Sequence, residues 1–163
     1  MRIKTGFAIG ALALASLLAA AVSAFAAHNP SMATDASAKV VVSTRSVGAY
    51  GQILVNSKGH ALYMFVPDKQ KKVTCVSAAC TAVWPPLKLA SGAKAVASGG
   101  AKASRLGSDA DPAGGRVVTY DHWPLYTYAG DTKAGVAAGQ ALNVNGGLWY
   151  VLSASGMVIK KKP

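Results

Sequence analysis

Hydrophobic and polar residues alternate along residues 50–66, with the period of two that is typical of a β-strand with one buried face. The alternation is interrupted at 56–59, where the run Asn-Ser-Lys-Gly favours a turn. Together these features predict a β-hairpin over 50–66. The β-branched run at 40–44 predicts one further strand before it.

The same pattern predicts two more strand pairs. Residues 116–129 are expected to form a second hairpin, with its turn at 121–124 (Asp-His-Trp-Pro). Residues 148–152 and 157–159 are expected to pair around a turn that contains serine and glycine. The chain therefore predicts a mainly β fold.

One segment is helical by composition, and another is expected to be a long loop. Residues 77–83 (SAACTAV) predict a short helix, which should end at Trp84 because the residue before a proline avoids helical geometry. Residues 91–115 are rich in Gly, Ala, Ser and Lys and predict a loop with a short strand or turn inside it.

The N-terminus has the composition of an export signal. Arg2 and Lys4 precede an apolar run at 6–21, and Ala-Phe-Ala at 24–26 fits the cleavage rule of signal peptides. We therefore expect a cleaved signal peptide over residues 1–26. The alternative is an uncleaved membrane anchor, since the apolar run is nearly long enough to span a bilayer.

The remaining chain divides into three parts. Residues 27–38 predict a disordered leader, 39–159 the β domain and 160–163 a basic tail. The only cysteines, Cys75 and Cys80, lie far downstream of the expected cleavage site. We therefore expect neither a lipid anchor nor a transmembrane anchor after processing, and a periplasmic or secreted location.

The charge balance favours anionic partners. Removal of Arg2 and Lys4 leaves 15 basic residues against six aspartates, without any glutamate, for a net charge of +9. Lipid headgroups, lipopolysaccharide and acidic proteins are partners of suitable charge. The alternative is that scattered lysines only keep the protein soluble. Nucleic acid is not an expected partner, because the sequence has no platform of interleaved aromatic and basic residues.

An internal repeat is the most informative feature of the sequence. The run Leu-Tyr-Met-Phe-Val-Pro-Asp at 62–68 aligns without a gap with Leu-Tyr-Thr-Tyr-Ala-Gly-Asp at 125–131. Each copy follows a histidine and precedes a tryptophan, namely His60, His122, Trp84 and Trp149. We expect a single small domain of two pseudo-symmetric β-hairpin repeats with one short helix.

The duplicated motif, together with Trp-Pro-Pro-Leu at 84–87 and Gly-Gly-Leu-Trp-Tyr at 146–150, resembles the secreted-repeat family of predicted bacterial lipoproteins. The resemblance extends over about residues 50–156 and implies an exported repeat domain. The molecular function of that family is not established, so the resemblance implies no particular activity. This sequence departs from the lipoprotein members because it lacks a cysteine to carry the lipid.

The motif residues have a structural and a functional interpretation. Side chains alternate along a strand, so the two aromatic residues of each motif copy share one face of the sheet. We expect these aromatics to form the centre of the core, and a pocket for a flat or sugar-like ligand is the alternative. The set consists of Tyr63, Phe65, Tyr126, Tyr128, Trp84 and Trp149.

Asp68 and Asp131 follow their strands, where a carboxylate readily accepts hydrogen bonds from the backbone of the next turn. We expect this capping role. The alternative is a carboxylate pair, brought together by the repeat, that binds a cation or performs acid–base chemistry.

Cys75 and Cys80 predict a structural disulfide in an oxidising compartment. Residues five apart in a helix have Cα atoms roughly 8.6 Å apart, beyond disulfide reach, so Cys75 should lie outside the helix of Cys80. A redox pair or thiolate metal site is the alternative. His60, Met64 and His122 would suit copper or zinc, but we expect exposed turn histidines and no cofactor.

The sequence leaves three hypotheses for the function of the protein. The leading hypothesis is a non-catalytic extracytoplasmic binding or envelope-interaction module, with anionic envelope components or another envelope protein as partner. The second is a periplasmic metal-binding or redox accessory protein. The third is a hydrolase-like enzyme that uses the Asp68–Asp131 pair, although no residue pattern supplies a nucleophile or an oxyanion site.

Overall fold

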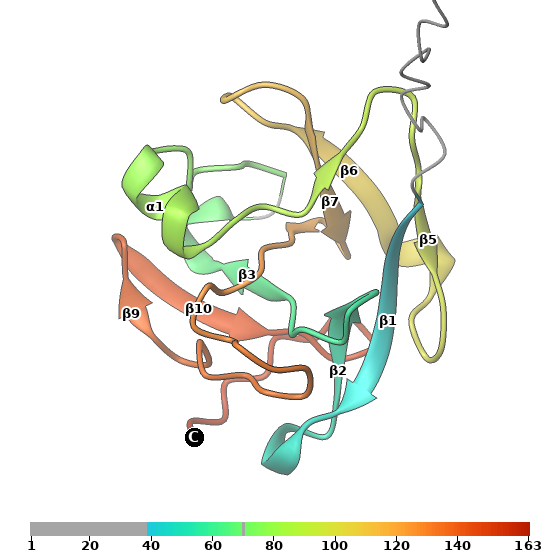
Figure 1. Ribbon diagram of the computed structural model, residues 1–163, viewed down its shortest axis with the longest axis vertical. Helices are drawn as coiled ribbons and strands as arrows, with labels where there is room; N and C mark the ends of the chain where they lie inside the picture. Colours follow the sequence, from blue (N-terminus) through green and yellow to red (C-terminus); the bar gives the residue numbers. More distant parts are fainter. Residues whose placement is uncertain (1–38, 70) are drawn as a thin grey trace, which may run out of the picture. The chain divides into compact units, whose positions relative to one another are not determined.

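The first strand pair forms where the β-branched run and the first alternating segment predict it. The computed structural model describes residues 39–69 and 71–163, so the predicted signal peptide and leader lie outside the described residues. Strand β1 (Val40–Ser46) pairs antiparallel with β2 (Gln52–Asn56) across the 3-10 helix η1 (Gly48–Tyr50). Strand β5 (Ala95–Ala97) adds to the other edge of β1 in parallel (Figure 1).

Two further small sheets complete the domain. In one of them β10 (Gly147–Val151) lies between β3 (Tyr63–Phe65) and β9 (Asn143–Val144). In the other, β7 (Arg116–Tyr120) pairs with β4 (Lys88–Leu89), β6 (Leu106–Ala110) and β8 (Trp123–Pro124). The remaining 3-10 helices are η2 (Val66–Asp68) and η3 (Ala103–Arg105). The expected mainly β fold is confirmed.

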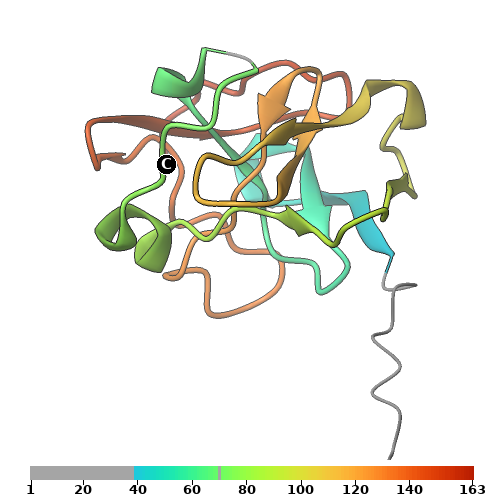
Figure 2. The same cartoon turned by 90° about the horizontal axis from the view of Figure 1, so that it is seen from above.

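The only α-helix in the described part of the chain is short. Helix α1 (Ala78–Val83) begins after Ser77, whose side-chain oxygen accepts a hydrogen bond from the backbone N–H of Cys80 at 3.2 Å. The helix ends at Trp84, the residue before Pro85, as the sequence predicts. It lies on the side of the domain away from β1 (Figures 1 and 2).

The two repeats exchange their last strands. Strand β10, from the second repeat, pairs with β3 of the first, whereas β4, from the first repeat, pairs with β7 of the second. Between these pairs, the backbones of Tyr63 and Tyr126 exchange two hydrogen bonds, each 2.9 Å long. Each repeat therefore needs the other to complete its sheet.

This exchange corrects the first predicted hairpin. Residues 50–66 form a hairpin only around the turn, where Val55 pairs with Ala61. The chain then leaves β2, and β3 pairs with β10 instead. The second predicted hairpin is likewise formed only around its turn: β7 pairs with Trp123–Pro124, which were predicted to lie in the turn, and Tyr126 of the predicted return strand instead bridges to Tyr63 and Pro86. The third predicted strand pair is confirmed by the bridge between Leu152 and Val158.

The segment 91–115 was expected to be loop with one short strand or turn, and it contains more structure than that. Strand β5 pairs with β1, and β6 pairs with β7 over five residues. Strand β6 has the sequence Leu-Gly-Ser-Asp-Ala, which carries no β-branched residue. Pairing with the hydrophobic strand β7 therefore outweighs its weak strand propensity.

Two hydrophobic clusters lie on opposite faces of the central strands. Tyr63 and Phe65 point into an aromatic cluster, and the intervening residue Met64, together with Leu62, points into an aliphatic one. This division follows from the alternation of side chains along a strand. The aliphatic cluster also contains Leu54, Val118, Leu125 and Leu152.

Candidate functional site

The tyrosine and aspartate that the two motif copies share form two reciprocal hydrogen bonds between the repeats. The Tyr63 hydroxyl of the first copy donates to Asp131 Oδ2 of the second at 2.7 Å. The Tyr126 hydroxyl of the second copy donates to Asp68 Oδ2 of the first at 2.8 Å. Both tyrosines are 0% exposed, and both aspartates are buried. We call these two interactions the tyrosine–aspartate clamps.

Each clamp also fixes the loop that follows its aspartate. Asp68 Oδ1 accepts from the backbone N–H of Thr74 at 2.8 Å and from its hydroxyl at 2.6 Å. Asp131 Oδ1 accepts from the backbone N–H of Ala138 at 2.8 Å. The predicted capping role of both aspartates is therefore confirmed. The sequence reasoning missed the tyrosine partner in the opposite repeat.

The tyrosine hydroxyls accept as well as donate. The Gly139 N–H donates to the Tyr63 hydroxyl at 3.2 Å, and the Cys75 backbone forms the corresponding hydrogen bond with Tyr126. Each hydroxyl thus binds two groups in the opposite repeat, namely the motif aspartate and the backbone of the loop that follows this aspartate. Both hydroxyls therefore donate and accept hydrogen bonds within the protein.

Burial dominates the electrostatics of the clamps. Desolvation raises the pKa of the Asp68 carboxyl, although hydrogen bonds from Thr74 and Tyr126 oppose the rise. It raises the pKa of the Asp131 carboxyl in the same way, against hydrogen bonds from Tyr63 and Ala138. Burial also raises the pKa of both tyrosines, so their hydroxyls stay protonated as donors. These groups are closed to a substrate in this conformation.

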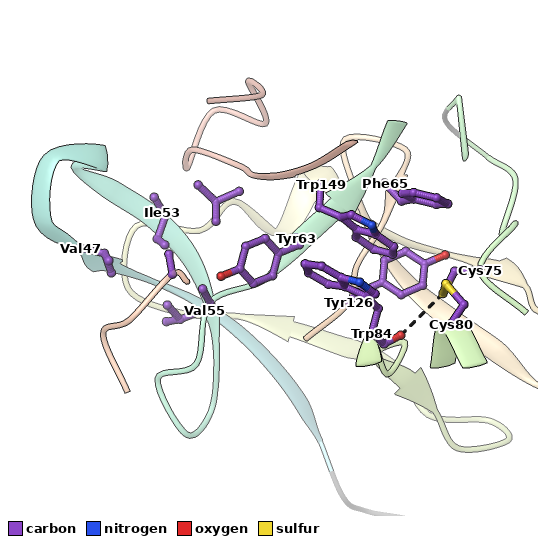
Figure 3. Close-up of a cluster of buried hydrophobic side chains, with 13 residues drawn as sticks. Val47, Ile53, Val55, Tyr63, Phe65, Cys75, Cys80, Trp84, Tyr126 and Trp149 are labelled. Carbon is purple, nitrogen blue, oxygen red and sulfur yellow. Dashed lines mark hydrogen bonds between the residues drawn. A yellow bond between two sulfur atoms is a disulfide. The ribbon is translucent and has the colours of Figure 1, made fainter. Parts of the chain in front are cut away.

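The motif aromatics stack across the two repeats. Trp84 and Trp149 lie parallel, with ring centroids 3.9 Å apart and an interplanar angle of 1°. Phe65 stacks on the outer face of the Trp149 ring at 4.0 Å, and Tyr128 stacks on Trp84 at 4.4 Å. Figure 3 shows Phe65 beside Trp149 within this cluster. Tyr63, Phe65, Trp84, Tyr126 and Trp149 are buried at the centre of the core, as predicted, whereas Tyr128 is half-buried and packs against them.

Cys75 and Cys80 form a disulfide with a Cα–Cα distance of 5.6 Å. Cys75 lies before α1 and Cys80 within it, which confirms the geometric prediction. Both cysteines are buried in the aromatic cluster, as seen at one end of Figure 3. The bond therefore ties the start of the helix to the loop that the Asp68 clamp holds.

The three residues considered for a metal have different surroundings. Met64 is buried in the aliphatic cluster, and His122 is exposed in the turn between β7 and β8. His60 is half-buried, and its coulombic interaction with Asp131 opposes the rise in the pKa of that carboxyl that burial causes. Across residues 39–69 and 71–163, no group of three or more His, Cys, Asp or Glu side chains could hold a metal ion.

The surface of the described domain is positively charged because lysine and arginine outnumber aspartate and because several aspartates are withdrawn from solvent. Asp68, Asp111 and Asp131 are buried, and Asp109 and Asp121 are half-buried. Every lysine and arginine of this part of the chain is exposed except Arg105, which is half-buried. Ion pairs neutralise two of these cations, in Lys88–Asp111 and Arg105–Asp121.

The basic tail is held against the domain. The buried Gln140 side chain donates to the backbone oxygens of Ile159 at 2.6 Å and Lys161 at 2.8 Å. Its own oxygen accepts from the Val151 N–H at 2.9 Å. The side chains of Lys160–Lys162 remain exposed. In the part of the chain described, no helix has the length and apolarity needed to cross a bilayer.

Comparison with known proteins identifies the repeat. A family model described as a secreted repeat of unknown function matches residues 44–88 and 107–153. The two matched segments coincide with the two copies inferred from the sequence, so the duplication and the resemblance are confirmed. No curated protein and no solved structure matches the chain.

Proposed function

The chain belongs to this family of secreted repeats, and from that premise we propose that it is a non-catalytic extracytoplasmic module that binds anionic components of the cell envelope. Its place of action is the periplasm or the cell exterior. The observation that carries the proposal is the distribution of charge in the described domain, where every cation except Arg105 is exposed and every aspartate is buried or half-buried.

The buried motif supports a binding role outside the motif rather than within it. The tyrosine–aspartate clamps use the hydroxyls and carboxylates of the repeat for contacts within the protein. The stacked aromatics are likewise core residues. What remains for recognition is the exterior of the described domain, where the fully exposed ionic side chains are those of lysine and arginine.

Such an exterior attracts anionic surfaces over a distance comparable to the Debye length, about 10 Å at 0.1 M salt. Each lysine or arginine that reaches an anionic membrane contributes on the order of 1 kcal/mol. The tail suits this role, because Gln140 fixes its backbone while three lysine side chains stay in solvent. Several such contacts would give reversible binding without any lipid anchor.

The test is co-sedimentation of the purified protein with vesicles. We expect binding to vesicles that contain phosphatidylglycerol, weak binding to phosphatidylcholine vesicles, and release by 0.5 M salt. Substitution of Lys160, Lys161 and Lys162 by glutamine should weaken binding by about fivefold for each lysine that contacts the surface. The matched control replaces the same lysines by arginine, which keeps the charge and should keep the affinity.

Two results would contradict the proposal. One is equal binding to anionic and zwitterionic vesicles. The other is binding that 0.5 M salt leaves unchanged, since a charge-driven interaction between exposed groups is screened at that concentration.

A further inference from the structure

We propose that a cavity on the first repeat binds one phosphate-type oxyanion through Arg45 and Lys58. This inference rests on the proposed function and names a specific site for it. The cavity has a volume of about 300 Å³ and lies between β1 and the turn that follows β2. Its polar lining consists of Ser43, Thr44, Arg45, Asn56, Ser57 and Lys58.

Arg45 is seated by two glycines. A Cβ atom added at Gly59 would lie 2.8 Å from Arg45 Nη1, and one added at Gly135 would lie 3.8 Å from the same atom. The two glycine backbones are joined, because the Gly135 N–H donates to the Gly59 oxygen at 3.0 Å. The guanidinium therefore rests on a flat junction between the repeats. Such seating lowers the entropy lost when an arginine binds a ligand.

The turn that carries Lys58 is also held in place. Asn56 Oδ1 accepts from the backbone N–H of Lys58 at 2.9 Å and from that of His60 at 3.1 Å. Ser43 lies on the same face of β1 as Arg45, because side chains alternate along a strand, and together with Ser57 it provides the hydroxyl groups of the lining. The cavity thus combines two cations with neutral donors.

Neither cation is neutralised within residues 39–69 and 71–163, where the ion pairs are Lys88–Asp111 and Arg105–Asp121. A guanidinium offers two parallel donors to an oxyanion, and an ammonium adds a compact charge. A phosphate group has the tetrahedral oxygens and the negative charge that such a set binds. Lipid headgroups and soluble phosphate share this chemistry.

The second repeat carries the opposite charge at the corresponding positions. Arg45 on β1 faces Ile53 on β2, and the corresponding pair in the second repeat is Asp109 and Val117. Gly59 corresponds to His122, because the backbone oxygen of each accepts a hydrogen bond from the loop that follows the aspartate of the other repeat. Gly135 N–H donates to Gly59, and Lys71 N–H donates to His122. Lys58 therefore corresponds to Asp121. Two cations on one repeat match two aspartates on the other, which predicts one site per molecule.

The experiment follows backbone amides by ¹H–¹⁵N NMR while inorganic phosphate is added to the purified protein, and measures phosphatidylglycerol vesicle binding in parallel. The test variant is Arg45→Gln with Lys58→Gln. The matched control, Lys94→Gln with Lys102→Gln, removes the same charge from exposed positions outside the cavity. Arg45→Lys, which keeps the charge but loses the paired donors, provides a second and milder variant.

We expect phosphate to shift the amides of Ser57, Lys58 and Gly59 with 1:1 saturation. The Gln pair should weaken this binding by about tenfold or more, and Arg45→Lys by less, while the control keeps it. Loss of vesicle binding in the Gln pair but not the control would assign the site to lipid headgroups. Phosphate shifts without that loss would assign it to soluble phosphate.

Equal loss in the Gln pair and the control would overturn the site but leave charge-driven membrane binding intact. Saturable phosphate binding at these amides, in a protein that does not bind anionic vesicles, would support the site but overturn charge-driven membrane binding. Shifts spread evenly over the exposed lysines would also overturn the site.

Discussion

Removal of a single clamp hydroxyl provides the sharpest test of how the repeats are joined. In Tyr63→Phe, Asp131 loses its hydrogen bond from the other repeat and keeps the donor from Ala138. In Tyr126→Phe, Asp68 keeps two donors from Thr74. A hydrogen bond to a charged group contributes about 1.5–3 kcal/mol. We expect Tyr126→Phe to cost about 1.5–2 kcal/mol and Tyr63→Phe about 2–3 kcal/mol.

The assay is urea unfolding followed by tryptophan fluorescence, since Trp84 and Trp149 lie inside the aromatic cluster. Tyr128→Phe is the matched control, because it removes a hydroxyl from the same motif at a ring that stacks on Trp84. No hydrogen bond of that hydroxyl is found in the described part of the chain, so the control should change stability by less than about 0.5 kcal/mol. Costs for Tyr63→Phe and Tyr126→Phe no larger than the control would refute the clamps.

Three further outcomes follow from the structure. Burial raises the pKa of Asp131 above 3.8, so the folded state keeps this proton to higher pH than the unfolded chain does. Urea titrations should therefore show that the wild type loses stability relative to Asp131→Asn as the pH rises from about 4 through the folded-state pKa. A stability difference that does not depend on pH would contradict this. His122 has a φ of 68°, so His122→Gly should raise the melting temperature through a gain of about 0.5–1 kcal/mol, whereas His122→Ala, which keeps the strain, should not. Cys75→Ala with Cys80→Ala should lower the free energy of unfolding by about 2 kcal/mol, and unchanged stability would show that the bond does not hold the loop.

Local patterns in the sequence predict the elements well. The helix at 77–83, its end at Trp84 and the position of Cys75 outside it depend on neighbouring residues, and each is found as expected. The aromatic core follows from side-chain alternation, which is also local. The repeat identified both tyrosines and both aspartates as equivalent, and the structure gives them equivalent contacts.

Long-range pairing could not be predicted in the same way. Tyr63 and its partner Asp131 are 68 residues apart, and the hydrophobic pattern of β3 suits β2 as well as β10. Only the exchange of strands between repeats decides the choice. The cavity cations could not be predicted for the same reason, because the register of β1 and β2 is what brings Arg45 and Lys58 to the lining of one cavity.

The central claim is that the repeated motif forms the scaffold while exposed cations recognise the ligand. The most direct measurement compares the affinity of folded Tyr126→Phe for phosphatidylglycerol vesicles with that of the wild type. Circular dichroism at the same temperature establishes that the variant is folded. We predict lower stability and an unchanged dissociation constant. A folded Tyr126→Phe protein that no longer binds the vesicles would contradict the claim and place recognition in the motif itself.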